Sequence, residues 1–408
     1  MHRTPSAWAT PSASFSRRNF LQRAAIGAGA IYGAGALQNA IAQVASPRFP
    51  EKADLILLTD RPPNLEMPLK YLREDLTPNE AFYVRWHLGV LPTVIDTAAF
   101  RLELFGHVQS PLSLSLEEIR KNFEPVSVVA VNQCSGNSRS FYEPRMPGVQ
   151  WGNGAIGNAR WTGVRLKDLL AKANVKAKAV DVSFNGLDGP TLPAAANFAG
   201  TPDFEKSLPF DRANDGEVIV AYEMNGQPLP MLNGFPLRLI VPGWYATYWV
   251  KALNQITVLD KPFDGFWMAK AYRVPNTPSY QESAKDLAKE TVPISRMTVR
   301  SLFAAPLAGE SIGPGPYEVQ GVALDGGSGI AKVELSGDGG KTWNLTKLDA
   351  DLGRYSWRRW RFNWRAVRGR NQLMVRATAN DGQTQTTSQW NRSGYGRNVI
   401  ESMEVVVA

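Results

Sequence analysis

The sequence predicts a mixed α+β domain followed by a C-terminal immunoglobulin-like β-sandwich. Three observations support this fold class. At 408 residues the chain is long enough for two to three domains. Short β-branched segments and two helical segments occupy its first part, whereas evenly spaced strands with glycine-rich turns fill its last part. Hydrophobic residues make up 44% of the chain and charged residues 20%, which is typical of a folded protein.

The first residues have the pattern of a cleaved export signal of the twin-arginine type. A twin-arginine motif lies at 16–21, a glycine-rich apolar run at 24–37 and a small-residue cleavage site at 40–42. The alternative is a membrane anchor, but this run of 14 residues is shorter than the ~20 that a spanning helix needs. We therefore expect a signal peptide at 1–42 and a periplasmic protein. Because this route exports folded proteins, it also indicates a cofactor that is inserted before export.

Charge and cysteine content exclude several classes of protein. The net charge is +8, but four basic residues and no acidic ones lie within 1–42, so the remaining chain does not favour nucleic-acid binding. The single cysteine, Cys134, excludes an internal disulfide, a multi-cysteine zinc site, a cysteine-ligated iron–sulfur cluster and attached c-type haem.

Residues 43–80 are rich in proline, and we expect them to form an irregular arm. In the region that follows, 81–270, Ser115 and Glu118 form a capping box that starts one helix, and an apolar face predicts a second helix at 164–173. Strands are expected at 81–86, 126–133, 180–185, 218–224, 237–241 and 250–259. The pair Asn225 and Gly226 predicts a hairpin turn.

Residues 271–295 are polar and contain several prolines, which predicts a linker. Beyond them, at 296–408, short β-branched or alternating segments are separated by glycine-rich turns. This spacing is typical of an immunoglobulin-like sandwich. Its strands are expected at 317–324, 330–336, 355–364, 372–379 and 399–407.

Cys134 lies on a polar loop directly after the predicted strand at 126–133, where functional residues are commonly held by a rigid scaffold. Arg139 follows closely, and a nearby cation favours the thiolate over the thiol. A thiolate here would be a nucleophile, with His87 or His107 as its basic partner, or a ligand of a soft metal. A lone cysteine is otherwise most often a small buried hydrophobe. Sequence spacing alone leaves these alternatives open.

Several arginines are further candidates for a site. Strand alternation places Arg85 and His87 on one face, either as a solvated arginine and a structural histidine or as part of a site. Together with Arg139, Arg392 and Arg397, they could surround a small oxyanion, because guanidinium groups match oxyanions in charge and geometry. The sequence alone does not show that folding brings these positions together.

These residues and further segments resemble the sulfite oxidase family of molybdenum enzymes, in particular exported bacterial sulfite dehydrogenases. The resemblance runs from about residue 60 to the C-terminus. The matching segments lie at 77–87, 134–139, 151–164, 221–226, 234–251 and 333–343. Because these blocks occur in the same order over most of the chain, the match is more specific than any single motif. It implies a sulfite-oxidase-type mixed α+β molybdopterin domain at 81–270 and a dimerisation sandwich of immunoglobulin type at 296–408.

The resemblance implies a molybdenum–molybdopterin cofactor and no haem in this chain. Cys134 would ligate the molybdenum, and the dithiolene of the pterin would supply the other sulfur ligands. The residues implied as cofactor contacts are Tyr83, Arg85, His87, Asp188, Asn233, Arg238, Trp249, Val250 and Lys251. Trp249 and Val250 would act through the main chain, and Asn233 stands where many members have histidine.

The resemblance also implies an oxyanion pocket lined by Arg85, Arg139 and Trp151. The family's last pocket arginine lies near a Trp-Asn-x-x-Gly segment. That segment is offset by one residue here, so Arg392 or Arg397 would fill this role.

One departure from the family concerns a pocket tyrosine. Phe263 and Phe266 stand at the positions that match it, so the phenol is missing unless Tyr272 or Tyr248 replaces it. This departure leaves open whether sulfite or another reduced sulfur compound is the substrate.

The resemblance implies oxidation of sulfite to sulfate, with electrons passed to a separate c-type cytochrome. It also implies a homodimer, or a heterodimer with a cytochrome subunit. The alternatives are a sulfane dehydrogenase or a sulfoxide reductase on the same scaffold, and a cofactor-free periplasmic protein that binds an oxyanion. The several arginines favour a small oxyanion over a neutral sulfoxide. The twin-arginine leader favours a protein with a cofactor.

Overall fold

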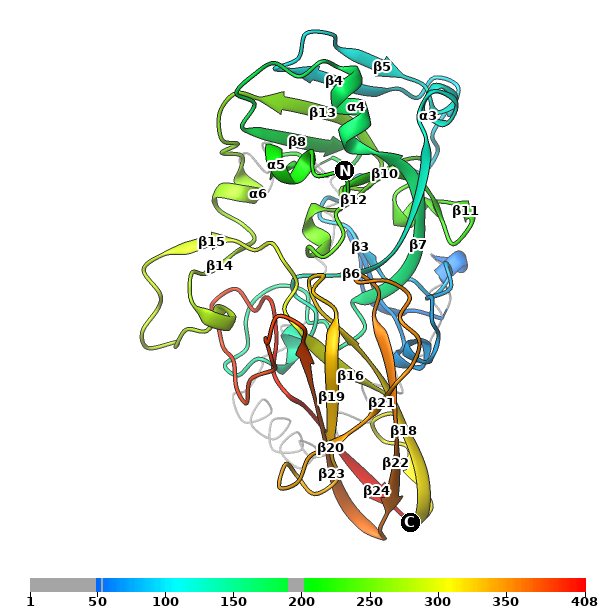
Figure 1. Cartoon of the computed structure of the whole chain (residues 1–408), viewed down its shortest axis with the longest axis vertical. Coiled ribbons are helices and arrows are strands. Elements are labelled where there is room, and N and C mark those ends of the chain that lie inside the picture. The colour runs from blue at the N-terminus through cyan, green and yellow to red at the C-terminus, as the bar shows by residue number, and fades with distance from the viewer. Residues whose placement is uncertain (1–48, 53, 190–201) are drawn as a thin grey trace, which may run out of the picture. The chain divides into compact units, whose positions relative to one another are not determined.

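The computed structural model describes residues 49–52, 54–189 and 202–408, which belong to one compact unit (Figure 1). The predicted signal peptide at 1–42 lies outside the described residues. Strands predominate in the described part of the chain, and its helices are few and short. The predicted mixed α+β class is therefore confirmed only in part. None of the described helices is long and apolar enough to cross a membrane.

Three sheets precede residue 270. The first has the order β1 (Ile56–Asp60), β2 (Pro63–Glu66) and β3 (Val84–Arg85). The second has the order β11 (Gln227–Pro228), β10 (Ile219–Met224), β7 (Ile156–Arg165) and β6 (Pro125–Gln133), and β12 (Arg238–Ile240) also pairs with β10. The third has the order β5 (Leu112–Leu114), β4 (Leu102–Gly106), β13 (Leu253–Leu259), β8 (Asp181–Gly186) and β9 (Lys206–Pro209).

Short helices connect these strands. The α-helices within the described residues are α3 (Leu116–Asn122), α4 (Leu166–Lys172), α5 (Phe210–Ala213) and α6 (Phe266–Ala269). The 3-10 helices are η1 (Pro50–Lys52), η2 (Leu69–Arg73), η3 (Arg139–Phe141), η4 (Met231–Asn233), η5 (Ala246–Tyr248) and η6 (Pro278–Tyr280). The capping box at the start of α3 is confirmed, because Ser115 Oγ accepts from the Glu118 N–H and the Glu118 carboxylate accepts from the Ser115 N–H.

The strand β7 is absent from the sequence-based prediction, and it determines where Cys134 lies. It pairs with β6 from Pro125 opposite Val164 to Gln133 opposite Ile156. Because this pairing ends at Gln133, the next residue leaves the sheet as a loop. The predicted second helix starts two residues later than expected, at Leu166, because its first residues still pair with β10.

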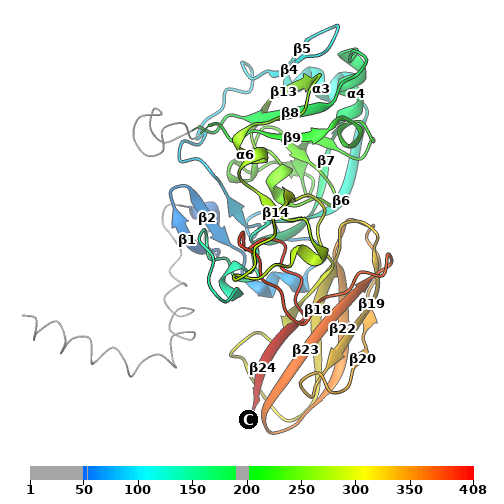
Figure 2. The same cartoon turned by 90° about the vertical axis from the view of Figure 1, so that its left-hand side faces the viewer.

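The predicted linker contains a hairpin of β14 (Arg273–Pro275) and β15 (Thr291–Pro293). Two further sheets form the C-terminal region, and Figure 2 shows their long strands side by side. One has the order β16 (Arg300–Ala305), β18 (Gly315–Leu324), β22 (Arg358–Ala366) and β21 (Lys347–Leu348). The other has the order β17 (Ser311–Ile312), β24 (Glu401–Val407), β23 (Gly369–Ala379), β19 (Ile330–Ser336) and β20 (Asn344–Leu345). The region is β-rich, and its immunoglobulin-like topology stays a prediction.

Two clusters of buried hydrophobic residues form the core. The smaller cluster lies within the C-terminal region and includes Val319, Trp360 and Leu373. The larger cluster packs the sheets that precede residue 270, but it also contains Leu302 of β16 and Trp357 from the C-terminal region. The C-terminal region therefore shares a core with the part of the chain that carries Cys134.

Candidate functional site

A cavity opens beside Cys134, where β6 ends. Its lining residues are Tyr83, Arg85, His87, Cys134, Ser135, Leu232, Asn233, Arg238, Ala246, Thr247, Lys251 and Tyr272. Folding thus brings together seven of the residues that the sequence implicates in cofactor or oxyanion binding, from segments more than 150 residues apart. The implicated residues outside this lining are Arg139, Trp151, Asp188, Trp249, Val250, Arg392 and Arg397.

Cys134 is 7% exposed, and a tight turn follows it. Its N–H donates to Ala155 O at 2.9 Å, and its carbonyl accepts from the Asn137 N–H at 3.0 Å. No group of three or more histidine, cysteine, aspartate or glutamate side chains within the described residues could hold a metal ion. A soft metal bound at Cys134 would therefore take its remaining ligands from a cofactor or from the substrate.

Three cationic side chains line the cavity, namely Arg85, Arg238 and Lys251, whereas no carboxylate is among its lining residues. Burial lowers the pKa of Arg238 to about 10, so this guanidinium stays charged at neutral pH. Its Nη1 donates to Asn233 O at 2.9 Å. Burial and the charge on Arg238 lower the pKa of Lys251. The cavity therefore attracts anions.

His87 is fixed by aromatic contacts. Its ring stacks on Phe204 with centroids 3.7 Å apart, and its Nε2 shares a hydrogen bond with Tyr272 Oη. Burial and the neighbouring charges on Arg85 and Lys251 hold the pKa of His87 well below its ordinary value. The imidazole is therefore neutral at pH 7 and can accept as well as donate hydrogen bonds.

Several buried polar atoms of the lining residues have no hydrogen-bond partner within the described part of the chain. They are His87 Nδ1, Ser135 Oγ, Asn233 Oδ1, Arg238 Nε and Thr247 Oγ1. A buried polar atom that lacks a partner costs about 1–3 kcal/mol. The cavity consequently fits a ligand that carries both donors and acceptors and is anionic. The molybdopterin that the resemblance implies is such a ligand, with its polar ring and its phosphate.

Arg139 lies next to the cavity and is packed in a cradle of glycines. A Cβ added at Gly148 would lie 2.5 Å from Arg139 Nη1, and one added at Gly136 would lie 2.8 Å from Nη2. The guanidinium also lies 4.8 Å from the ring centre of Tyr395, and Nη2 donates to Ser393 O at 3.3 Å. Its charge thus lies beneath the loop that carries Cys134, outside the residues that line the cavity.

Three implicated residues pack behind those that line the cavity, namely Trp151, Trp249 and Val250. Trp151 is completely buried and packs edge-on against Tyr83. The N–H groups of Trp249 and Val250 donate to Ala246 O and Tyr248 O, both at 3.0 Å. These two main-chain donors are therefore already used within the protein.

Asp188 is buried near Lys251 without lining the cavity. Burial raises the pKa of Asp188, and the charge on Lys251 opposes that rise. The carboxylate can therefore orient Lys251, but the structure does not bring it into the cavity.

Neither candidate for the last pocket arginine, Arg392 or Arg397, is among the residues that line the cavity. Arg392 Nε and Nη2 donate to the carboxylate of Glu282, at 2.9 and 2.5 Å. Arg397 Nη1 donates to Glu401 Oε1 at 2.5 Å. Each guanidinium is held by a carboxylate, and this pairing keeps it away from Cys134.

A tyrosine does line the cavity. Tyr272 stacks on Tyr395 with centroids 5.2 Å apart and directs its hydroxyl to His87. Phe263 and Phe266 lie outside the lining, and Phe266 is 46% exposed. Tyr248 donates to Ile294 O and does not reach the cavity. Of the two tyrosines considered as replacements for the missing phenol, Tyr272 lines the cavity and Tyr248 does not.

The lining residues that the sequence reading did not assign are Ser135, Leu232, Ala246 and Thr247. Ser135 directly follows Cys134, and Leu232 directly precedes Asn233. Their position next to assigned residues was the sequence feature that could have identified them. Ala246 and Thr247 lie on η5, a short helix that no local sequence pattern indicates.

Comparisons with known proteins agree with this site. The family model "Oxidoreductase molybdopterin binding domain" matches residues 87–267, and "Mo-co oxidoreductase dimerisation domain" matches residues 291–406. The mitochondrial sulfite oxidase of Macaca fascicularis is 35% identical over 86% of this chain and 65% of its own length. The chain thus spans slightly less than two thirds of this relative's length.

Two further relatives show the same relation. Sulfite oxidase of Gallus gallus is 35% identical over 77% of this chain and 68% of its own length. Sulfite oxidase of Arabidopsis thaliana is 32% identical over 73% of this chain and 76% of its own length. Among solved structures, the sulfane dehydrogenase SoxCD of Paracoccus pantotrophus has the same fold, with a TM-score of 0.72 and 24% identity over 85% of each chain.

Proposed function

The chain belongs to the sulfite oxidase family of molybdopterin oxidoreductases, and we propose that it oxidises sulfite to sulfate in the periplasm with a separate c-type cytochrome as electron acceptor. The observation that carries this proposal is the cavity beside Cys134, which is lined by two arginines and a lysine and by no carboxylate. Sulfite and sulfate are small oxyanions, and a cationic cavity of this kind binds them.

The family implies a molybdenum–molybdopterin cofactor, and the lining residues fit it. Cys134 would ligate the metal through Sγ, and Arg238 and Lys251 would hold the anionic phosphate of the pterin. Asn233 Oδ1 and Thr247 Oγ1 would bind polar atoms of the ring, because both lack partners within the described residues. When bound, the cofactor supplies the two-electron oxidation of the substrate sulfur.

The chain's own residues bind and orient the oxyanion. Arg85 would form charge-assisted hydrogen bonds to its oxygens. Tyr272 stays protonated because burial raises the pKa of its phenol, so Oη can donate a hydrogen bond to an oxyanion. The neutral His87 beside it accepts or donates at Nε2 and fixes the direction of that hydroxyl.

The leader and the composition support the remaining parts of the proposal. A twin-arginine motif at 16–21 supports periplasmic export of the folded holoenzyme. The chain has one cysteine and hence no motif that attaches c-type haem, so the electrons from sulfite would leave to another protein.

Steady-state kinetics of the purified holoenzyme test the proposal, with a c-type cytochrome as electron acceptor and either sulfite or a persulfide as electron donor. Sulfite should give the highest kcat/KM, and sulfate should inhibit competitively. Turnover of the persulfide without turnover of sulfite would replace the proposal with a sulfane dehydrogenase. Sulfate binding by a protein that contains no molybdenum would instead show a cofactor-free oxyanion-binding protein.

A further inference from the structure

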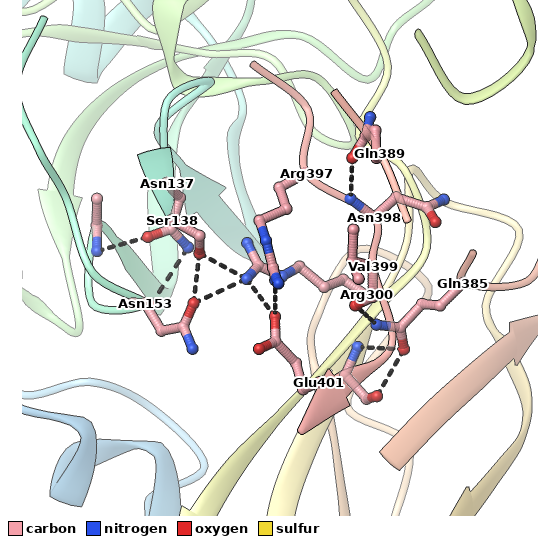
Figure 3. Close-up of polar contacts among 12 residues, drawn as sticks. Asn137, Ser138, Asn153, Arg300, Gln385, Gln389, Arg397, Asn398, Val399 and Glu401 are labelled. Atoms are coloured by element: carbon pink, nitrogen blue, oxygen red, sulfur yellow. Dashed lines mark hydrogen bonds and ion pairs between the residues drawn. The ribbon is translucent and has the colours of Figure 1, made fainter. Parts of the chain in front are cut away.

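The loop that carries Cys134 is held from two sides. On one side it bonds to the segment 151–155, because the Ser138 N–H donates to Gly152 O at 2.6 Å. On the other side a buried arginine reaches it from the C-terminal region. Nη2 of Arg300, the first residue of β16, donates to Ser138 Oγ at 2.6 Å and to Asn153 Oδ1 at 2.8 Å (Figure 3).

Ser138 has the backbone conformation that most requires such support. Its φ of 70° and ψ of 23° lie in the left-handed region, which is disfavoured for a residue with a Cβ. This residue lies between Cys134 and Arg139 and directly precedes η3. The hydroxyl of Ser138 bonds to Asn153 as well as to Arg300, so these two side chains hold the turn that sets Cys134 relative to Arg139.

Arg300 is completely buried, and a carboxylate directs it towards the loop. Its Nη2 lies 2.7 Å from Glu401 Oε1 of β24, and the same oxygen accepts from Arg397 at 2.5 Å. One carboxylate therefore serves two guanidinium groups, and Nε and Nη1 of Arg300 have no partner within the described residues. A buried charge with so little compensation is weak evidence for a stabilising role. This favours a role in positioning the loop.

We propose that Arg300 is a positioning residue for the metal ligand: it locks the left-handed turn at Ser138 and thereby fixes Cys134 and Arg139. Arg300 is not among the residues that line the cavity. The inference rests on the proposed function where it takes Cys134 as a molybdenum ligand, but the turn itself can be measured without metal. The C-terminal region then completes the catalytic loop as well as carrying the proposed dimer contact.

Hydrogen exchange followed by mass spectrometry tests this in the metal-free and the loaded full-length protein. Arg300→Met removes the bonds from Arg300 to Ser138, Asn153 and Glu401, and it leaves Glu401 paired with Arg397. We expect roughly 10- to 100-fold faster exchange of the amides in 137–142, as the loss of one charge-assisted bond predicts. Arg300→Lys should restore part of the protection.

Arg376→Met is the matched control, because Arg376 of β23 pairs with Glu334 of the neighbouring strand at 3.0 Å. This control should leave exchange in 137–142 unchanged. Unchanged exchange there in Arg300→Met, with faster exchange only in β16 and β24, would overturn the proposal and make Arg300 a contact of the C-terminal region alone.

A second comparison isolates the left-handed turn. Glycine adopts a positive φ without a steric penalty, whereas alanine does not. Adding Ser138→Gly to Arg300→Met should therefore restore part of the lost protection, and adding Ser138→Ala should not. Equal behaviour of the two double variants would contradict the mechanism. If Arg300→Met does not fold, the single variants provide the same comparison, with Ser138→Ala losing more protection than Ser138→Gly.

Molybdenum retention gives a further readout in the loaded protein. After extended dialysis, Arg300→Met should lose molybdenum several-fold faster than the wild type and Arg376→Met. Equal retention would count against a positioning role for the ligand. A wild-type protein that fails to oxidise sulfite would refute the proposed function, yet it would leave the result of the exchange experiment on the turn intact.

Discussion

Arg85 and Arg238 bring the same charge to the cavity under different constraints. Arg238 is 4% exposed, and its guanidinium bonds to Asn233 O and Asn132 Oδ1, so it is fixed before a ligand binds. Arg85 is half-buried, and its Nη1 bonds to Asn64 Oδ1 at 3.2 Å. We therefore expect Arg238 to hold the cofactor and Arg85 to meet the substrate.

Replacing Arg85 tests this division of roles. Arg85→Met should raise the KM for sulfite by about 10- to 100-fold and lower kcat less, because one charge-assisted bond is worth about 1.5–3 kcal/mol. Arg85→Lys should restore part of the affinity, because an ammonium group lacks the planar fork. Steady-state kinetics measures both, with the exposed Arg101→Met as control. A KM for Arg85→Met within twofold of the wild type would contradict the assignment.

Lys206 is a buried lysine that forms no ion pair with a carboxylate within the described part of the chain. Its Nζ donates to Trp267 O at 2.7 Å and lies 4.6 Å from the ring centre of Tyr248. Burial lowers the pKa of Lys206 to about 7. Between about pH 7 and the ordinary lysine pKa of about 10.4, the unfolded chain therefore binds a proton that the folded protein has released. The contribution of Lys206 to the free energy of unfolding consequently rises with pH across this window.

Lys206→Met should remove that rise. The stability of the variant relative to the wild type is expected to be highest at pH 7 and to decrease towards pH 10, because only the wild type gains stability by losing a proton. Urea unfolding at several pH values measures this difference, with the exposed Lys270→Met as control. Parallel pH profiles for Lys206→Met and the wild type would show that burial does not shift this lysine.

Local sequence context allowed some of these residues to be predicted and not others. Cys134 follows a strand of regular pattern, and His87 and Arg238 lie in segments that resemble known motifs. Tyr272 lies beyond the segment in which the phenol was expected, and the chain returns it to the cavity just before β14. Lys206 and Arg300 are polar residues within strands, and only the packing of distant elements shows that they are buried.

At the scale of elements, the loop after β6 requires glycine backbone that packs closely against the Arg139 side chain. Gly148 has a φ of +109°, and an added Cβ would lie 2.5 Å from Arg139 Nη1. Gly353 offers a comparison, because it has a φ of +124° and nothing within 4 Å of an added Cβ. An alanine at either position would therefore have an unfavourable positive φ. Only at position 148 would its Cβ also clash with a neighbouring side chain.

Gly148→Ala should destabilise the protein more than Gly353→Ala does, by about 1–3 kcal/mol, which is the usual cost of overpacking. It should also raise the KM for sulfite, because Arg139 and the loop of Cys134 are displaced together. Denaturant unfolding and kinetics of both variants measure these effects. Equal losses of stability would mean that the Arg139 side chain moves away freely and that the cradle does not fix it.

Strands were predicted correctly where one hydrophobic periodicity dominates the segment. The predicted strands at 126–133 and 330–336 coincide with β6 and β19 within one residue. β7 escaped prediction because its segment mixes glycine, asparagine and arginine with apolar residues, and it is a strand because it pairs on both edges with β6 and β10. In the segment predicted as a strand at 81–86, only Val84 and Arg85 pair.

At the scale of the whole molecule, three observations concern the C-terminal region. It shares the larger hydrophobic cluster through Leu302 and Trp357, it supports the loop of Cys134 through Arg300, and it matches a dimerisation domain over 291–406. The β-rich character of the C-terminal region was predictable from its evenly spaced strand segments. The shared core was not predictable, because burial of a residue against a distant sheet produces no periodic pattern in the sequence.

The dimerisation match predicts a two-fold dimer of this chain, since two-fold dimers are the commonest oligomers. Light scattering coupled to size exclusion should give twice the mass of the mature chain across a wide range of concentrations. A heterodimer with a small cytochrome would appear as a second chain and as haem absorption in the same peak. A monomer at every concentration, without a second chain, would contradict the prediction.

Cys134 is the proposed protein ligand to a molybdenum–molybdopterin cofactor in the cationic cavity. X-ray absorption at the molybdenum edge, applied to the purified wild type and to Cys134→Ser, tests this directly because it reports the atoms bound to the metal. We expect molybdenum in both proteins and one sulfur ligand fewer per metal in Cys134→Ser. The same number of sulfur ligands in the two proteins, or a wild type without molybdenum, would contradict it.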